Sequence, residues 1–204
     1  MVPRVRRQIT RIFATSAAVK RRFLRENLET LVEVIERIAA ALCAGHKLLL
    51  FGNGGSAADA QHIAAEFVGR FKIERTPLAA IALTTDTSAL TAIGNDYGYA
   101  DVFARQVRAL GGAGDVALAI STSGNSANVL RAVAACRRLG IQTVALTGGT
   151  GGKLADAADW VLRVSGSTES ARIQETHILV GHVICELVDE RLFAARGPDT
   201  GARQ

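Results

Sequence analysis

Two glycine- and hydroxyl-rich segments are the parts of this sequence best suited to bind an anion. Residues 52–56 (GNGGS) and 121–126 (STSGNS) each follow a short apolar run and lead into a helical pattern. Glycines let the main chain approach a ligand closely, and free N–H groups at a helix start, with nearby hydroxyls, donate to phosphate oxygens. Ordinary turns use the same residues, so a single loop of this kind would be weak evidence, whereas two are stronger. The chain has neither G-x-G-x-x-G nor G-x-x-x-x-G-K-[ST], which disfavours dinucleotides and nucleoside triphosphates and favours a monophosphate ester.

A second set of chemically capable residues lies on two helical patterns. His62 and Glu66 are four residues apart, and Gln174 and His182 are eight apart, so each pair shares one side of a helix. Beside a phosphate loop, imidazole and carboxylate groups can act as general base and acid or can bind a metal. A buried histidine bonded to a main-chain carbonyl is the equally plausible alternative for either helix alone. His177 is on a different face and is predicted to be structural.

The pattern of apolar residues predicts the elements that must position these groups. Short continuous apolar runs at 47–51, 78–83, 116–120, 143–146 and 160–164 indicate strands buried on both faces of a parallel sheet. Helical patterns at 57–70, 87–93, 100–108, 126–139, 153–157 and about 169–194 separate the strands and end the chain. This alternation predicts an α/β fold with a doubly wound, five-stranded parallel sheet. Ligands bind beyond the carboxyl ends of such strands, where both glycine-rich segments lie, whereas His46 precedes a strand at the opposite edge and has no predicted role.

A long helical pattern precedes this core. It runs from about residue 5 to residue 43, and its apolar stripe at Leu28, Leu31, Val32, Ile35 and Ile38 needs another surface to cover it. A neighbouring subunit is a natural cover, so we expect an oligomer. The 204 residues are therefore interpreted as one domain, with an oligomerisation segment at 1–45 and the α/β core and last helix at 46–195.

Composition excludes several classes of function. The net charge is +5, but residues 1–25 hold eight of the 24 Lys and Arg and no acid, which leaves a net charge of −3 for the rest. The basic charge therefore belongs to one segment. Such a segment could bind polyanions or a membrane surface, and its Arg-rich, acid-free composition is also found in transit peptides. We interpret it as a solvated helix face, and no direct binding to nucleic acid is expected. The sequence has neither an apolar run long enough to span a membrane nor a signal-peptide core. Cys43, Cys136 and Cys185 are far apart in apolar surroundings, which predicts reduced core thiols in a cytoplasmic protein.

Taken together, the motifs resemble those of the phosphoheptose isomerases, which are sedoheptulose 7-phosphate isomerases of the sugar-isomerase (SIS) domain fold. The matching segments are GNGGSA at 52–57, Gln61-His62-x-x-x-Glu66, Gly94-Asn95-Asp96, ISTSGNS at 120–126 and Arg172-Ile173-Gln174-Glu175-x-His177-x-x-x-x-His182. The resemblance covers nearly the whole chain, including the N-terminal helix. It implies a single SIS domain that converts sedoheptulose 7-phosphate to D-glycero-D-manno-heptose 7-phosphate through an enediol, for the biosynthesis of lipopolysaccharide heptose.

The resemblance also implies a role for individual residues. It assigns the sugar phosphate site to Asn53, Gly54 and Gly55, the phosphate to Ser56, Ser121, Thr122, Ser123 and Ser126, and the sugar chain to Asn95 and Asp96. It implies one zinc ion per subunit site, with the ligands His62, Glu66, Gln174 and His182. Of these four residues, Glu66 and Gln174 would also contact the substrate. Glu66 and His182 would be the base and the acid. In the family these sites form at the subunit interfaces of a homotetramer.

A related protein of the same fold offers an alternative function. It is a non-catalytic tetramer that binds the bacterial replication initiator, and residues 79–95, 106–123 and 170–174 of this chain resemble it as well. That regulator lacks the groups that match Glu66 and His182, whereas this chain has both. A sugar-phosphate sensor would need neither group. The sequence therefore favours the enzyme.

Overall fold

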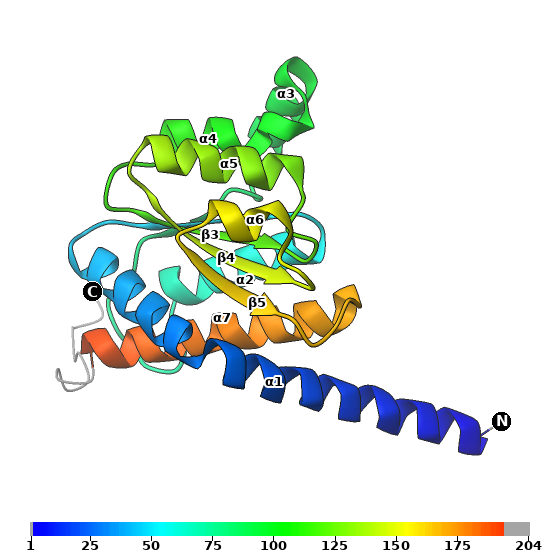
Figure 1. Ribbon diagram of the computed structural model, residues 1–204. Helices are drawn as coiled ribbons and strands as arrows, with labels where there is room; N and C mark the ends of the chain where they lie inside the picture. Colours follow the sequence, from blue (N-terminus) through cyan, green and yellow to red (C-terminus); the bar gives the residue numbers. More distant parts are fainter. Residues whose placement is uncertain (1, 194–204) are drawn as a thin grey trace.

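Five parallel strands form the centre of the molecule. The structure is a computed structural model that describes residues 2–193, and its sheet has the order β2-β1-β3-β4-β5 (Figure 1). The strands are β1 (Leu48–Gly52), β2 (Ala80–Ala82), β3 (Val116–Ser121), β4 (Gln142–Gly148) and β5 (Trp160–Val164). The predicted fold class is confirmed. Because the strand order reverses beside β1, the carboxyl ends of β1 and β3 form the switch point at which open α/β sheets bind ligands.

Helices cover both faces of the sheet, in two layers that Figure 1 shows above and below the strands. One layer contains α1 (Val2–Cys43), α2 (Gly55–Val68) and α7 (Ser170–Phe193), and the other contains α3 (Thr87–Tyr97), α4 (Val102–Leu110), α5 (Ala127–Arg138) and α6 (Gly152–Ala157), with a 3₁₀ turn η1 (Tyr99–Asp101). Alternate strand residues point to opposite layers, so Leu48 and Leu50 enter one hydrophobic core while Leu49 and Phe51 enter the other. This arrangement explains why the strands are continuously apolar.

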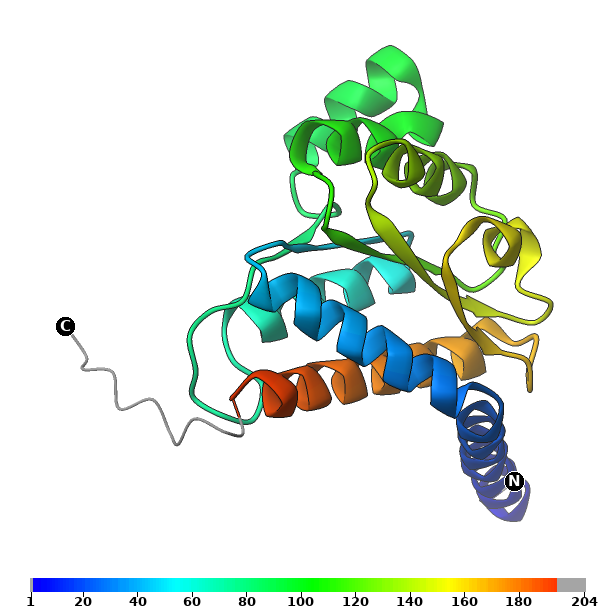
Figure 2. The ribbon, with the colours of Figure 1, turned by 60° about the vertical axis from the view of Figure 1, so that its left-hand side comes forward.

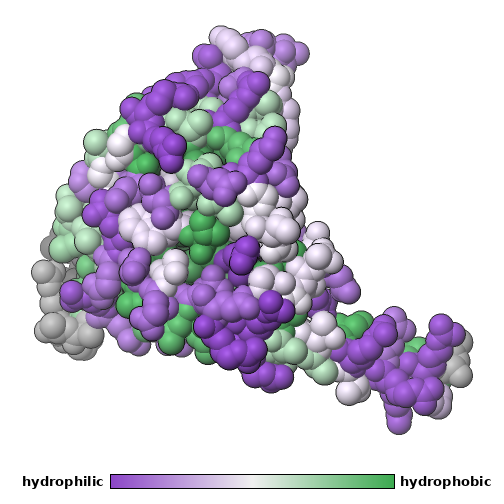
Figure 3. All heavy atoms as spheres, viewed as in Figure 1, coloured by the Kyte–Doolittle hydropathy of each residue, from purple (hydrophilic) through white to green (hydrophobic). Residues whose placement is uncertain are grey.

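The helix α1 has two different halves. Residues 2–15 are exposed on every side and project from the body, whereas the second half packs on α7 and β5 (Figures 1 and 2). The projecting part carries hydrophobic as well as hydrophilic surface (Figure 3). Only part of the predicted apolar stripe is left for another subunit to cover. Leu31 and Ile35 are buried within the chain, while Leu28 and Val32 are each 48% exposed. Ile38 is buried as well, so three of the five stripe residues serve the domain's own core.

The structure also bears on the predicted burial of the three cysteines and on the predicted end of the last helix. Cys136 and Cys185 are buried and free, but Cys43 is exposed, so its prediction as a core residue is wrong. It is the last residue of α1, where the helix leaves the core. The predicted ends of the last helix, at 194, and of the core, at 195, lie outside the described residues. Within residues 2–193, no helix combines the length and the apolar character needed to cross a membrane.

Candidate active site

The two glycine- and hydroxyl-rich segments lie at the switch point, as predicted. The first follows β1 and opens α2, and the second follows β3 and opens α5. The two strand ends approach so closely that a Cβ on Gly52 would lie 2.7 Å from the main-chain oxygen of Ile120 and 2.8 Å from the Cβ of Ser56. Only glycine leaves room for this approach. The sequence therefore places the start of α2 directly beside the loop that follows β3.

The loop after β3 gathers hydroxyl groups at the start of α5. The hydroxyl oxygens of Ser121 and Ser126 are 3.1 Å apart, and Ser121 also accepts a hydrogen bond from the main-chain N–H of Gly124. Ser126 is the N-cap of α5, yet its hydroxyl makes no capping bond to this helix. Thr122 is half-buried and Ser123 is exposed. The helix start thus retains donors that can face an anion.

An asparagine pair joins the two loops. The Asn53 amide donates to Asn128 Oδ1 at 2.9 Å, the Asn128 amide donates back at 2.8 Å, and the Tyr99 hydroxyl also donates to Asn53. Asn128 and Tyr99 were missed by the sequence analysis. Asn128 had a usable signal, because it is a polar residue in the first turn of a helix that follows a predicted phosphate loop. Tyr99 carried no local signal.

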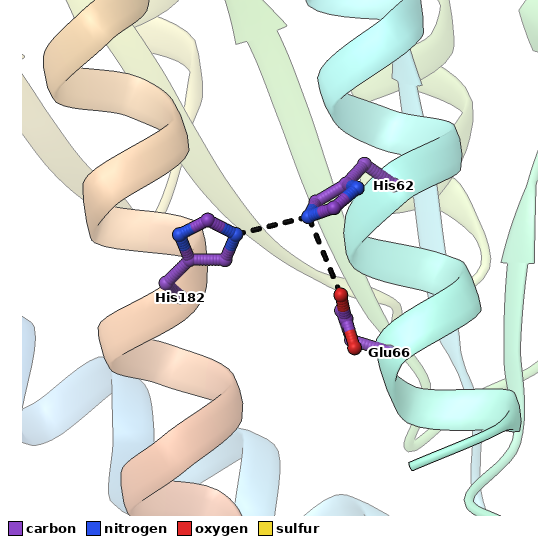
Figure 4. Close-up of side chains that lie close together, drawn as sticks. All are labelled: His62, Glu66 and His182. Atoms are coloured by element: carbon purple, nitrogen blue, oxygen red, sulfur yellow. Dashed lines mark hydrogen bonds and ion pairs between the residues drawn. The ribbon is translucent and has the colours of Figure 1, made fainter. Parts of the chain in front are cut away.

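His62, Glu66 and His182 come together between α2 and α7 (Figure 4). The Nε2 atoms of the two histidines are 2.9 Å apart, and His62 Nε2 lies 3.3 Å from Glu66 Oε1. The helices can approach so closely because residue 181 of α7 is glycine: a Cβ there would lie 2.5 Å from Cδ1 of Ile63. Gly181 directly precedes His182 in sequence, and Ile63 directly follows His62. The structure therefore brings together three of the four side chains that were predicted to converge from α2 and α7.

This trio suits a metal ion in chemistry and in spacing. Two imidazole nitrogens and a carboxylate oxygen lie within 4.8 Å of one another. In a tetrahedral zinc site with bonds of about 2.0–2.1 Å, neighbouring ligand atoms are about 3.3 Å apart. The two separations that involve His62 Nε2, 2.9 Å to His182 and 3.3 Å to Glu66, are close to this value. Both histidines direct Nε2 to the same point, an arrangement that one shared proton or one shared cation can satisfy. The three side chains fit a zinc ion.

The fourth predicted ligand lies nearer the loops. Gln174 is eight residues before His182 on α7, a rise of about 12 Å along the helix. A Cβ on Gly55 would lie 2.5 Å from Nε2 of Gln174, so the amide packs against the first residue of α2. Among the described residues, no hydrogen bond joins Gln174 to the trio. The structure places the Gln174 amide beside Gly55, and its roles as a metal ligand and as a substrate contact both stay predictions.

Asn95 and Asp96 are not brought to this site within the described chain. They are exposed near the end of α3, and the Asn95 amide donates to the carboxylate of Asp96 at 2.8 Å. The helix α3 has no buried residue and stands away from the sheet (Figure 1). Their predicted contact with the sugar chain stays a prediction.

The other two histidines lie where the sequence placed them. His177 is fully buried, its Nε2 is 3.2 Å from the carbonyl oxygen of Thr147, and burial lowers its pKa to about 4. It is therefore neutral at pH 7 and structural, with its Nε2–H donating to Thr147. His46 precedes β1, at the amino-terminal edge of the sheet, 3.9 Å from Asp115 and away from the loops.

Comparison with known proteins agrees with this geometry. Residues 12–148 match the model of a protein family described as SIS domain, the class that the fold and the site define. A phosphoheptose isomerase of Aquifex aeolicus is 58% identical over 183 residues, which are 90% of this chain and 95% of that protein. The phosphoheptose isomerase of Thermodesulfovibrio yellowstonii is 51% identical, over 91% and 92% of the two chains. The chain therefore belongs to the phosphoheptose isomerase family.

Solved structures agree with this assignment. A phosphoheptose isomerase from Neisseria gonorrhoeae is 49% identical, with a TM-score of 0.86 over 91% of this chain and 99% of its own. The enzyme from Francisella tularensis is 39% identical, also with a TM-score of 0.86, over 90% and 97%. Nothing in these relatives supports the alternative of a replication regulator.

Proposed function

We propose that this chain interconverts sedoheptulose 7-phosphate and D-glycero-D-manno-heptose 7-phosphate. The observation that carries the proposal is the convergence of Glu66 and His182 from two helices, on the domain that also holds two hydroxyl-rich loops at the switch point of its sheet. The kinship with phosphoheptose isomerases supports the choice of a seven-carbon sugar phosphate. Such a product would supply heptose for surface polysaccharides.

The reaction needs two proton transfers, and the site has one group suited to each. Conversion of the ketose to the aldose moves a proton from C1 to C2 and another from O1 to O2, by way of a cis-enediol. A carboxylate can carry the carbon-bound proton between adjacent carbons on one face, which is the role we assign to Glu66. An imidazole can exchange the oxygen-bound protons near neutral pH, which is the role we assign to His182. Glu66 is half-buried, which keeps it partly shielded from water.

The loops hold the phosphate away from the bonds that change. The hydroxyls of Ser56, Ser121, Thr122, Ser123 and Ser126 and the N–H groups at the starts of α2 and α5 are the donors that we assign to the ester. Because the phosphate does not change during the reaction, these contacts bind substrate and transition state alike. Their role is to position the sugar chain along the path towards Glu66.

We also propose a zinc ion, one per subunit site, held by His62, Glu66 and His182 with Gln174 as a further ligand. Zinc supplies a Lewis acid that can polarise a substrate oxygen. The spacing of the three donor atoms supports this proposal. Metal analysis of untagged protein should find about one zinc per chain, His62→Ala should lose it, and His46→Ala, at the far edge of the sheet, should keep it. Wild-type protein without bound metal would contradict the proposal.

The projecting half of α1 supports a homotetramer. Val5, Ile9, Ile12 and Phe13 are exposed on a helix that leaves the body of its own chain, and such a surface is costly to leave in water. Light scattering should give four times the chain mass at micromolar concentration, and removal of residues 1–18 should lower that mass. The three cysteines, all of them free, support a cytoplasmic location.

The direct test of the proposed reaction is incubation with sedoheptulose 7-phosphate, followed by chromatographic separation of ketose and aldose phosphates. We expect the aldose heptose 7-phosphate to accumulate to equilibrium with the wild type. Glu66→Gln has the same shape without the base, and it is the matched control. Absence of aldose with folded wild-type protein that holds zinc would refute the proposal.

A further inference from the structure

The connection between α2 and β2 lies along the helix that carries His182. This strap (residues 69–79) contains Lys72, whose ammonium is 2.6 Å from a carboxylate oxygen of Glu186, and Arg75, whose guanidinium is 2.9 Å from Asp189. Residues 182, 186 and 189 follow one another at helical spacing and lie on one side of α7. The strap therefore contacts the same side of α7 that presents His182 to the site.

Arg75 anchors the strap to both helices of the site. It is buried, and besides its bond to Asp189 it donates to the main-chain carbonyls of Glu66 at 2.9 Å, Phe67 at 2.8 Å and Gly69 at 3.1 Å. The first two are carbonyls of the last turn of α2, which have no partner within the helix, and Gly69 is the C-cap of that helix. One side chain thus ties the main chain of Glu66 to α7.

Phe71, held near this anchor, contacts His182 itself. Its ring stacks on the imidazole with the centroids 5.5 Å apart and an angle of 21° between the planes. The ring of His62 meets the same imidazole edge-on, with centroids 5.1 Å apart and an angle of 69°. His182 therefore has one face on Phe71 and its Nε2 directed at His62. The flat contact restricts rotation of the imidazole about its side-chain bonds.

We propose that Phe71 is a positioning residue for the isomerisation: the strap holds its ring against His182 and so fixes the plane in which that imidazole exchanges protons with the substrate. This inference rests on the proposed function, since it assigns Phe71 no chemistry of its own. Supporting groups that orient a reactive imidazole typically change activity by about 10- to 100-fold when they are removed. Phe71 is partly buried at the edge of the core, so its loss need not prevent folding.

The test compares Phe71→Leu with Phe71→Tyr in the full-length protein. Leucine keeps apolar bulk but offers no flat face, so we expect kcat to fall about 10-fold with KM within twofold of the wild type. Tyrosine keeps the ring and should restore kcat to within about twofold. If Phe71→Leu does not fold, Phe71→Met takes its place with the same expectation, because its flexible side chain fills the space without a ring.

Trp160→Leu is the matched control for loss of a half-buried aromatic ring. Trp160 opens β5 at the opposite edge of the sheet, so this variant should keep kcat even where its melting temperature falls as much as that of Phe71→Leu. If the wild type does not isomerise the substrate, the proposed function is refuted, and with it the role of Phe71 in positioning His182 for that reaction. An active wild type with unchanged kcat in Phe71→Leu, or an equal loss of kcat in Phe71→Tyr, would overturn the positioning role alone.

Discussion

Arg75→Met removes a buried cation and leaves Asp189 without its partner. Both side chains are almost fully buried, at 1% and 4% exposed, and Arg75 also donates to carbonyls at the end of α2. Burial raises the pKa of the Asp189 carboxyl, and the hydrogen bond and charge of Arg75 oppose that rise. Methionine preserves much of the volume but none of the donors. The expected effect on folding therefore comes mainly from an orphaned carboxylate.

Protonation of the Asp189 carboxylate limits this loss of stability, because the neutral acid is much less costly to bury than the charged form. A carboxyl group of ordinary pKa near 3.9 can be kept protonated at pH 7 at a cost of about 4 kcal/mol, and removing one partner of a buried ion pair typically costs about 3–5 kcal/mol. We therefore expect Arg75→Met to lower the free energy of unfolding by about 4 kcal/mol at pH 7. The double variant Arg75→Met/Asp189→Leu should be more stable than Arg75→Met, because no charge remains to be buried.

The pH dependence has a definite sign. In the variant, the folded-state pKa of Asp189 lies above its unfolded value, so between these two values the folded state binds more protons. The deficit relative to wild type should therefore shrink by about 1.4 kcal/mol per pH unit as the pH falls from 7 to 5.

Urea unfolding at fixed protein concentration, followed by circular dichroism, measures these differences. A deficit that stays constant between pH 7 and pH 5, or a double variant less stable than Arg75→Met, would refute this account of the pair.

Three further perturbations have expected outcomes. Burial lowers the pKa of His177 to about 4, whereas its pKa in the unfolded chain is near 6.5. As the pH falls from about 6.5 to about 4, the wild type should therefore lose about 3 kcal/mol of its free energy of unfolding. Urea unfolding should show a correspondingly smaller loss for His177→Gln. Gly55→Ala directs a Cβ at the flexible amide of Gln174, so kcat/KM should fall at least 10-fold in steady-state assays while stability changes by about 1 kcal/mol or less. Ser121→Ala with Ser126→Ala should raise KM about 10-fold or more and change kcat little, because phosphate binding is uniform.

Each of these outcomes can fail separately. Parallel pH profiles for wild type and His177→Gln would mean that the buried imidazole is not linked to folding. Unchanged kcat/KM in Gly55→Ala would remove Gln174 from the substrate site. A loss confined to kcat in the double serine variant would mean that the loop acts on the transition state and not on the phosphate.

The strands were predictable because sheets of this class bury both faces. The continuous run at residues 160–164 coincides with β5, and the other runs differ from the observed strands by at most two residues at either end. The spacing of His62 and Glu66 also predicted one helix face. What spacing could not show is that α7 crosses α2 so that His182 meets them, because that depends on Gly181 packing against Ile63.

Contacts that depend on loops were beyond prediction from local patterns. Phe71 and Arg75 lie in an irregular segment whose sequence gives no periodic signal, and only the packed structure brings them to His182 and Asp189. The apolar stripe on α1 shows a different limit, because here a local pattern did predict contact but not the contacting surface. Its pattern correctly marked apolar contact, but periodicity does not say whether the chain's own core or another molecule provides the cover, and Leu28 stays exposed beside buried Leu31.

The central claim is that Glu66 transfers the carbon-bound proton, and solvent isotope incorporation tests it most directly. Sedoheptulose 7-phosphate is incubated in D₂O with wild type or Glu66→Gln, and deuterium at C1 and C2 is measured by NMR alongside turnover. We predict that the wild type incorporates deuterium, and that Glu66→Gln loses both incorporation and about 10²-fold or more in kcat while it keeps its oligomeric state and phosphate affinity. Turnover and incorporation near wild-type levels in Glu66→Gln would contradict the account.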